Sequence, residues 1–194
     1  MNIALFGTSA DPPTLGHQTI LNWLSERYDL CVVWVSHNPF KSHQASIEQR
    51  IEMMRLSIES IDPARPNLEL HPEISSPRTL ITVQQAREIW QDAKFTLVVG
   101  SDLVRQLPTW YQADRLLRQV KILVVPRPGF WMTDRDMIAL QSHNADISIG
   151  ELTVPIVSSS AYRNNGDKSG IIPSVAAYIE QEHLYEWQVK HAIH

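Results

Sequence analysis

Residues 3–17 read IALFGTSADPPTLGH, and this stretch sets the expectations for the whole fold. Its first part, residues 3–6, is a short apolar run that ends at Gly7, which is typical of a buried strand in a parallel sheet. Over residues 15–28, apolar side chains recur at the spacing of an amphipathic helix. The stretch therefore predicts a strand, a turn that holds two prolines, and a helix.

The same alternation continues along the chain. Further strands are expected at residues 30–35, 67–71, 95–99, 122–125 and 146–152. Further helices are expected at residues 47–58, 81–90, 133–140 and 173–183, and a helical stretch ends at 116–117. Strands that alternate with helices form parallel βαβ units, so the sequence predicts an α/β fold with a doubly wound parallel sheet. Such sheets bind ligands at the carboxyl ends of their strands, where the strand order reverses.

The composition narrows the class of protein. A chain of 194 residues with 43% hydrophobic and 20% charged residues fits one domain over residues 1–194, with 189–194 as a loose tail. The net charge of -4 is opposite to the basic excess of general nucleic-acid binders. The one cysteine, Cys31, excludes an internal disulfide and a cysteine-rich zinc site. With no apolar run long enough to span a membrane and no signal-peptide pattern, we expect a cytoplasmic protein without membrane or nucleic-acid partners.

The turn between the first strand and the first helix carries groups that suit a phosphate. Backbone N–H groups at a helix N-terminus favour an anion, and Gly7 and Gly16 would permit its close approach. Thr14 and His17 are three positions apart, so we expect a hydroxyl and an imidazole to point to the same spot. The turn is neither a dinucleotide-binding fingerprint nor a P-loop. Taken one by one, its residues would also fit an ordinary capped loop with a surface histidine.

Two segments resemble the signatures of the nucleotidyltransferase superfamily. Residues 14–17, TLGH, resemble the T/H-x-G-H signature, which holds the triphosphate of the incoming nucleotide in that superfamily. Many pyridine-nucleotide members carry histidine where this chain has Thr14. Residues 157–163, VSSSAYR, resemble the I-S-S-T-x-x-R signature, whose serines and arginine offer donors to phosphate. A polar N-capped turn is the alternative interpretation of this second segment.

Three further stretches resemble nicotinate-nucleotide adenylyltransferases in particular. They are GSD at 100–102 with LPTW at 107–110, RPG at 127–129, and NPFKSH at 38–43. The resemblance implies a Rossmann-like fold and the transfer of AMP from ATP to a pyridine mononucleotide, with release of pyrophosphate. Residues 76–83, SPRTLITV, depart from the family's S-Y-T-x-D-T-L at Arg78 and Ile81.

The resemblance also implies a role for individual residues. Trp110 would stack on the pyridine ring, and Asp102 would meet a ribose hydroxyl. Mg²⁺ would bridge phosphate oxygens and need few protein ligands, and no carboxylate pair suggests a dedicated metal cage. His17, Lys41 and Arg163 are the candidates for cations at the phosphates. The candidate residues are, for catalysis, His17, Thr14, Lys41 and Arg163; for ATP, Gly7, Thr8, Gly16, His17, Gly100, Asp102, Ser158, Ser159 and Arg163; and for the mononucleotide, Thr79, Trp110 and Arg127.

Several alternatives stay open at the level of sequence. Nicotinate mononucleotide is the expected acceptor on the resemblance alone, and nicotinamide mononucleotide is the first alternative. A pantetheine-phosphate adenylyltransferase also carries threonine in its first signature, but the Trp110 segment and the turn at 127–129 argue against it. A non-catalytic nucleotide-binding module would be expected to lose His17 or Arg163, and both are present. The sequence does not give the oligomeric state.

Overall fold

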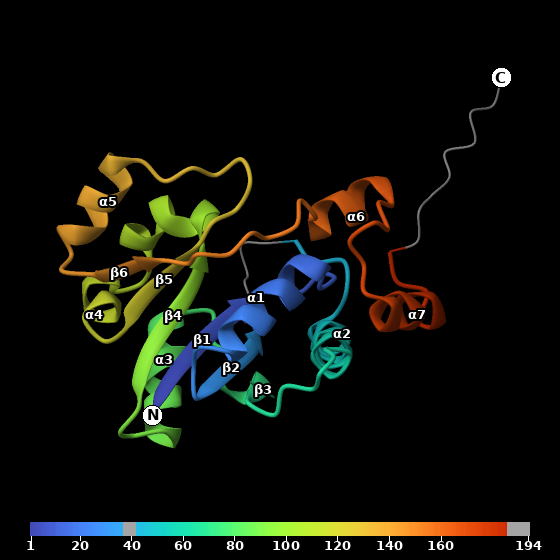
Figure 1. Cartoon of the computed structure of the whole chain (residues 1–194), viewed down its shortest axis with the longest axis horizontal. Helices are drawn as coiled ribbons and strands as arrows, with labels where there is room; N and C mark the ends of the chain where they lie inside the picture. Colours follow the sequence, from blue (N-terminus) through green and yellow to red (C-terminus); the bar gives the residue numbers. More distant parts are fainter. Residues whose placement is uncertain (37–41, 186–194) are drawn as a thin grey trace.

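Parallel strands form one central sheet in the computed structural model, which describes residues 1–36 and 42–185 (Figure 1). Their order across the sheet is β3-β2-β1-β4-β5-β6. The order reverses between β1 and β4, which confirms the doubly wound sheet that the sequence predicts. The strands are β1 (Asn2–Thr8), β2 (Leu30–Val35), β3 (Leu68–Leu70), β4 (Lys94–Gly100), β5 (Lys121–Val125) and β6 (Asp146–Ile149).

Helices cover both faces of this sheet, and a smaller group lies beside it. Helices α1 and α2 pack on one face, and α3, α4, α5 and the 3-10 helix η2 pack on the other. Helices α6 and α7 lie against α2 on the side away from the sheet (Figure 1). The helices are α1 (Leu15–Ser25), α2 (Ile47–Glu59), η1 (Pro72–Ile74), α3 (Thr79–Ile89), η2 (Ser101–Thr109), α4 (Ala113–Leu117), α5 (Asp134–Gln141), α6 (Ser159–Asn165) and α7 (Pro173–Gln181).

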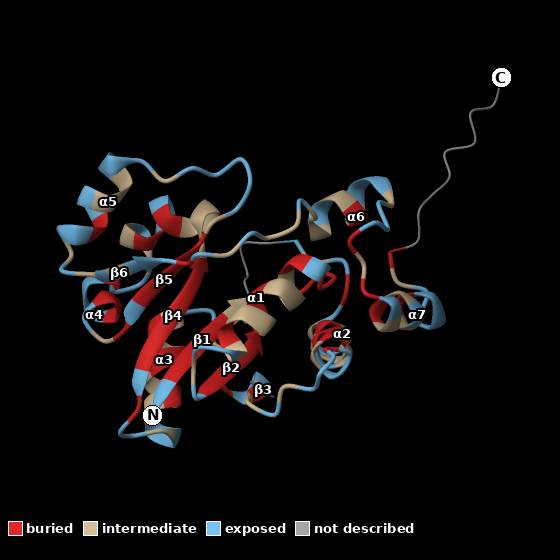
Figure 2. Ribbon diagram, viewed as in Figure 1, coloured by how far each residue is buried: buried red, intermediate tan, exposed pale blue. Residues whose placement is uncertain are grey.

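The strict alternation of strand side chains explains why both faces need a helix layer. In β1, Ile3 and Leu5 belong to the core beneath α3, whereas Ala4 and Phe6 belong to the core beneath α1. The central strands are therefore buried on both sides, as Figure 2 shows. Cys31 lies in this core, and burial raises the pKa of its thiol to about 12, so it acts as a small hydrophobic side chain.

The predicted elements are present, with shifts at their ends. The helix expected from residue 81 begins at Thr79, and the helix expected to end at residue 28 ends at Ser25. The predicted N-cap of α5 is confirmed, since the Thr133 hydroxyl accepts a hydrogen bond from the N–H of Asp136. The 3-10 helices η1 and η2 were not among the predicted elements; a proline lies inside η2 and another begins η1. Among the described residues, no helix has the length and apolar character that crossing a membrane requires.

Candidate active site

The candidate site lies where the carboxyl ends of β1, β4 and β5 meet, next to the reversal of strand order. The turn after β1 enters α1 there, and the segment before α6 packs against it. Ser159 Oγ donates a hydrogen bond of 2.7 Å to the carbonyl of Pro12, across 147 positions of sequence. The N–H of Leu15 donates to the carbonyl of Gly170 at 2.9 Å. The second signature segment is thus bonded to the turn that precedes the first, and the start of α1 is bonded to the segment that follows the second.

His17 is held in one orientation by both of its ring nitrogens. The backbone N–H of Thr14, the N-cap of α1, lies 3.0 Å from Nδ1, and the Thr14 hydroxyl lies 3.0 Å from the same atom. A backbone N–H can only donate, so Nδ1 is the acceptor and the ring proton resides on Nε2. Nε2 lies 2.9 Å from Oγ1 of Thr8, to which it donates. The ring therefore presents an N–H group on the side of β1.

The charge of His17 differs from the sequence-based expectation. Burial, with a smaller contribution from the positive charge of Arg127, lowers the pKa of His17 to about 4. The imidazole is therefore uncharged at neutral pH in the unliganded chain, and its charge beside a bound phosphate stays a prediction. Thr14 is also buried, and its hydroxyl contacts Nδ1 of His17, whereas the sequence predicted that the hydroxyl and the ring would point to the same ligand. Thr14 consequently orients His17, and His17 acts as a neutral hydrogen-bond donor.

The two glycines of the first turn make room for protein side chains. A Cβ atom at Gly7 would lie 2.3 Å from Cζ2 of Trp34, its partner on β2. A Cβ atom at Gly16 would lie 3.3 Å from Cγ1 of Val154. Close packing therefore requires a glycine at position 7 and favours one at position 16, whether or not a phosphate approaches them. Their assignment to ATP binding stays a prediction.

An acidic and a basic side chain meet at the ends of β4 and β5. Arg127 Nη1 lies 3.0 Å from Oδ2 of Asp102, and the backbone N–H of Arg127 donates to Oγ of Ser101 at 2.9 Å. The other carboxylate oxygen, Oδ1 of Asp102, is buried and makes no hydrogen bond within the described residues. A Cβ at Gly100 would lie 2.3 Å from that oxygen, so glycine is what allows Asp102 to fold over the strand end. Asp102 thus keeps one buried acceptor without a partner in the described residues, and its role at a ribose hydroxyl stays a prediction.

The second signature uses part of its polar groups for its own structure. The Ser158 hydroxyl caps α6 by accepting a hydrogen bond of 3.0 Å from the N–H of Ala161. Arg163 Nη1 donates to the backbone carbonyl of Asp11, and Nη2 donates to Oγ of Ser160 at 3.2 Å. Arg163 is partly buried, with its side chain 21% exposed. It therefore stands against the first turn, as a triphosphate ligand would require.

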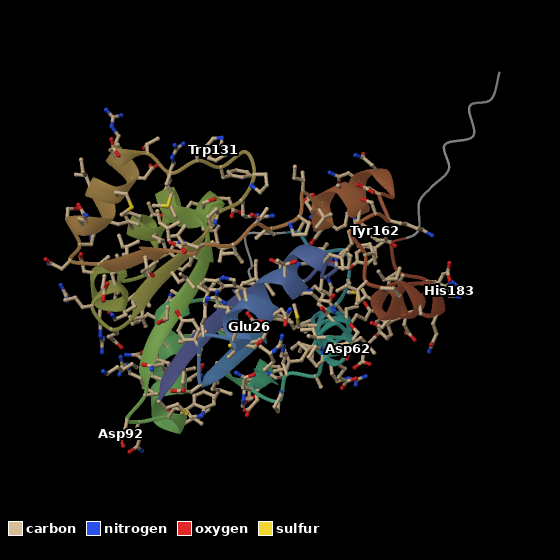
Figure 3. The ribbon with its side chains drawn as sticks, viewed as in Figure 1. Glu26, Asp62, Asp92, Trp131, Tyr162 and His183 are labelled. Atoms are coloured by element: carbon tan, nitrogen blue, oxygen red, sulfur yellow. The ribbon has the colours of Figure 1, made fainter. Side chains whose placement is uncertain are left out.

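The residues expected at the mononucleotide lie on neighbouring segments of the same sheet edge. Trp110 follows η2 and is half-buried against the core beneath α3. The guanidinium carbon of Arg78 lies 4.1 Å from the ring centroid of Tyr111, which connects the start of α3 to the Trp110 segment. Thr79 begins α3 and is half-buried. Figure 3 places Trp131 on the loop between β5 and α5, beyond the strand end, where the residue is 80% exposed.

Three residues of the site were not among the predicted functional residues. Arg50 is buried, and its Nη1 donates to the carbonyls of Ser9 at 2.8 Å and Ser36 at 3.1 Å, which fixes the turn after β1. Asp11 and Tyr185 are hydrogen-bonded to each other in the interior. Asp11 lies within residues 3–17, but nothing in the sequence of that stretch indicates that it would bond to Tyr185, which is 174 positions away.

Two of the sequence-based expectations concern cations at the phosphates: the side chain of Lys41 and a divalent metal ion. Lys41 lies outside the described residues. Among the described residues, no group of at least three histidine, cysteine, aspartate or glutamate side chains could hold a metal ion.

Comparison with known proteins agrees with this geometry. Residues 5–165 match the cytidylyltransferase-like family. A protein of a Synechocystis species, described as a probable nicotinate-nucleotide adenylyltransferase, is 38% identical over 95% of this chain and 99% of its own. The nicotinate-nucleotide adenylyltransferase of Bacillus subtilis is 25% identical over 95% of this chain and 98% of its own.

Solved structures show the same fold. The nicotinic acid mononucleotide adenylyltransferase of Plasmodium falciparum, complexed with NaAD, matches with a TM-score of 0.81 at 19% identity, over 95% of this chain and 97% of that one. From the family match, the relatives and the converging signatures, we conclude that this chain belongs to the nicotinate-nucleotide adenylyltransferase family of cytidylyltransferase-like proteins.

Proposed function

We propose that the protein transfers AMP from ATP to nicotinate mononucleotide, forming deamido-NAD and pyrophosphate in NAD biosynthesis. The observation that carries this proposal is that the turn after β1, which leads to His17 and is bonded by Arg163, lies beside the end of the neighbouring strand β4, where Asp102 has a carboxylate oxygen without a partner in the described residues. This set offers donors for a triphosphate and an acceptor for a ribose hydroxyl. The family to which the chain belongs supports the same reaction.

The reaction asks the protein for alignment and charge compensation. The phosphate of a mononucleotide is largely dianionic at neutral pH, since its second pKa is about 6, and it needs no general base. One of its oxygens attacks the α-phosphorus of ATP, a new P–O bond forms there, and the bond to the bridging oxygen of pyrophosphate breaks. Both substrates must therefore be bound together and in line.

His17 and Arg163 are the described residues that we assign to the triphosphate. The Nε2 proton of His17, which Thr8 accepts in the unliganded chain, would be donated to a phosphate oxygen. An anion at this position favours the charged imidazole and so opposes the effect of burial on the pKa. Arg163 would add a planar charged donor, and Ser159 stays bonded to the first turn. Thr14 supports the reaction by fixing the ring, and Lys41 remains a proposed cation of this group.

A divalent cation would enter with ATP as part of the substrate. Mg²⁺ keeps several waters and binds through phosphates and one or two carboxylates, so the absence of an acidic cluster from the described residues suits a nucleotide-bound ion. It would neutralise charge on the leaving pyrophosphate. We also propose that residues 1–194 form one domain. We further propose that the protein is cytoplasmic and that neither nucleic acid nor a membrane is its partner.

One observation favours nicotinate over nicotinamide as the acceptor base. The guanidinium of Arg78 stacks on Tyr111, one residue from Trp110, and no carboxylate lies within salt-bridge distance of it in the described part of the chain. A cation without a carboxylate partner, next to the residue that we assign to the pyridine ring, suits the negative charge of nicotinate.

The experiment is a measurement of pyrophosphate release with MgATP and one acceptor at a time. Nicotinate mononucleotide, nicotinamide mononucleotide and phosphopantetheine are compared at equal concentration. We expect the highest kcat/KM with nicotinate mononucleotide and no release without an acceptor. Faster release with phosphopantetheine, or an AMP-enzyme trapped with ATP alone, would contradict the proposal.

A further inference from the structure

A buried carboxylate lies in the middle of the turn that we assign to ATP. Asp11 is 1% exposed. Its Oδ2 accepts a hydrogen bond of 3.1 Å from the N–H of Gln44, and its Oδ1 accepts one of 3.3 Å from the N–H of Ala45. The hydroxyl of Tyr185 donates to Oδ1 at 2.6 Å, from 174 positions away. The phosphate chemistry described above gives this carboxylate no role.

Arg163 stands next to this carboxylate without being hydrogen-bonded to it. Its Nη1 is 3.8 Å from Oδ2 of Asp11, which is longer than a hydrogen bond, and donates instead to the backbone carbonyl of the same residue. The buried Arg50 is a second cation in the neighbourhood, since the charge of Asp11 opposes the lowering of the Arg50 pKa by burial. The charges of two arginines therefore act on one carboxylate, and only Arg163 lies within ion-pair distance of it in the described residues.

Tyr185 holds its hydroxyl as a permanent hydrogen-bond donor to the Asp11 carboxylate. Its ring is buried and lies edge-on to Tyr162, with centroids 5.6 Å apart, and Tyr162 is the residue before Arg163 on α6. Figure 3 shows Tyr162 between α6 and the segment that leads to α7. Burial and the neighbouring carboxylate raise the pKa of Tyr185 far above its ordinary value, so its hydroxyl keeps the proton and donates at every working pH.

We propose that Asp11 and Tyr185 are a positioning pair that keeps Arg163 available to the triphosphate. The two backbone N–H groups and the Tyr185 hydroxyl satisfy Asp11, so Arg163 can turn from the carbonyl of Asp11 to a phosphate oxygen without leaving a buried charge uncompensated. Without the hydroxyl, the carboxylate would draw Arg163 into a direct ion pair and hold it away from ATP. This inference rests on the proposed role of Arg163 in ATP binding.

The test removes only the hydroxyl and measures ATP binding before turnover. Tyr185→Phe keeps the ring on Tyr162, and we expect the Kd of a non-hydrolysable ATP analogue and the KM for ATP to rise about 10-fold, the scale of one hydrogen bond to a charged group. The KM for the mononucleotide should stay unchanged. Tyr178→Phe is the matched control, because Tyr178 lies on α7, is half-exposed, and its hydroxyl makes no hydrogen bond to another described residue. That control should bind the analogue like the unaltered protein.

A second variant separates positioning from simple structural support. The double variant Asp11→Asn/Tyr185→Phe lacks the negative charge that would hold Arg163 away from ATP. Its affinity for the ATP analogue should therefore return toward that of the unaltered protein. A purely structural role would instead make the double variant worse than either change alone. Unaltered affinity in a well-folded Tyr185→Phe protein, or equal losses in both tyrosine variants, would overturn the inference. The binding assay contains no acceptor, so an unexpected acceptor in the turnover assay would refute the proposed reaction and leave this result standing.

Discussion

The turn assigned to ATP and the segments assigned to the pyridine ring are built in opposite ways. In the turn, Asp11 and Thr14 are 1% and 2% exposed, and both are hydrogen-bonded. On the pyridine side, Tyr111 next to Trp110 is 42% exposed, and Phe130, which is paired with Arg127, and its neighbour Trp131 are 53% and 80% exposed. The first region is part of the interior, whereas the second is an open aromatic rim.

This difference indicates how the two halves of the reaction are controlled. Donors that are buried and bonded are held in fixed positions, which is what stabilisation of a phosphoryl-transfer transition state requires. An exposed rim can exchange side chains with little effect on folding, so it is where the choice of acceptor can change. Changes in the turn should therefore act on kcat and on ATP, and changes on the rim should act on the acceptor.

The largest effect is expected for His17→Ala. Loss of one preorganised donor should lower kcat by roughly 10²-fold or more. The hydrogen bonds of the ring to Thr8 and to the N-cap Thr14 are lost as well, so the folding of the variant is checked by circular dichroism. Thr19→Ala is the control on the same helix, because among the described residues the Thr19 hydroxyl bonds only to the carbonyl of Leu15. Steady-state pyrophosphate release measures both variants, and near-normal turnover in a folded His17→Ala protein would refute the role of this histidine.

A smaller effect, confined to the acceptor, is expected for Trp110→Ala. Stacking of a base on an aromatic side chain contributes about 1–3 kcal/mol, so the KM for the mononucleotide should rise about 5- to 150-fold. The KM for ATP should move little, and Trp110→Phe should recover most of the loss because it keeps an aromatic face. Equal losses for both substrates, or a collapse of the circular dichroism spectrum, would show that Trp110 only packs against the core.

The buried turn should also leave a trace in the pH dependence of stability. The pKa of His17 is about 4 in the folded chain, against an ordinary value of 6.5. Between these values the unfolded chain binds a proton that the folded chain does not, so the contribution of the neutral ring is fully present above pH 6.5 and is lost as the pH falls toward 4. Urea unfolding should show a steeper loss of stability in this window for the unaltered protein than for His17→Asn. Parallel curves would contradict the assignment of a neutral ring.

The sequence could predict the sheet and the positions of the two signatures, but not the contacts that individual residues make across the fold. Alternation of apolar runs predicted the sheet, because strands buried on both faces must be apolar throughout, as 30–35 is. The two signatures could be placed because each lies beside a strand or helix end. That the His17 ring is uncharged could not be predicted, because its pKa depends on burial and on Arg127, which is distant in sequence. The packing of Gly7 on Trp34 needed the register of two strands, and the bond from Tyr185 to Asp11 needed the whole fold.

The smallest effect is expected at the rim, for Arg78→Met. Methionine keeps an apolar stem on the Tyr111 ring and removes the charge, so packing is retained while the cation near the pyridine site is lost. Because the site is exposed to solvent, a charge pair there contributes about 0.2–1 kcal/mol, and the preference for nicotinate over nicotinamide mononucleotide should fall by about 1.4- to 5-fold. The ratio of the two kcat/KM values measures this preference, and the KM for ATP should not change. Arg115→Met is the matched control, because Arg115 is an exposed arginine on α4 whose guanidinium lies near Gln112. If both variants keep the original ratio, the acceptor is chosen by backbone groups at the ring edge, and the charge of Arg78 has no part in the choice.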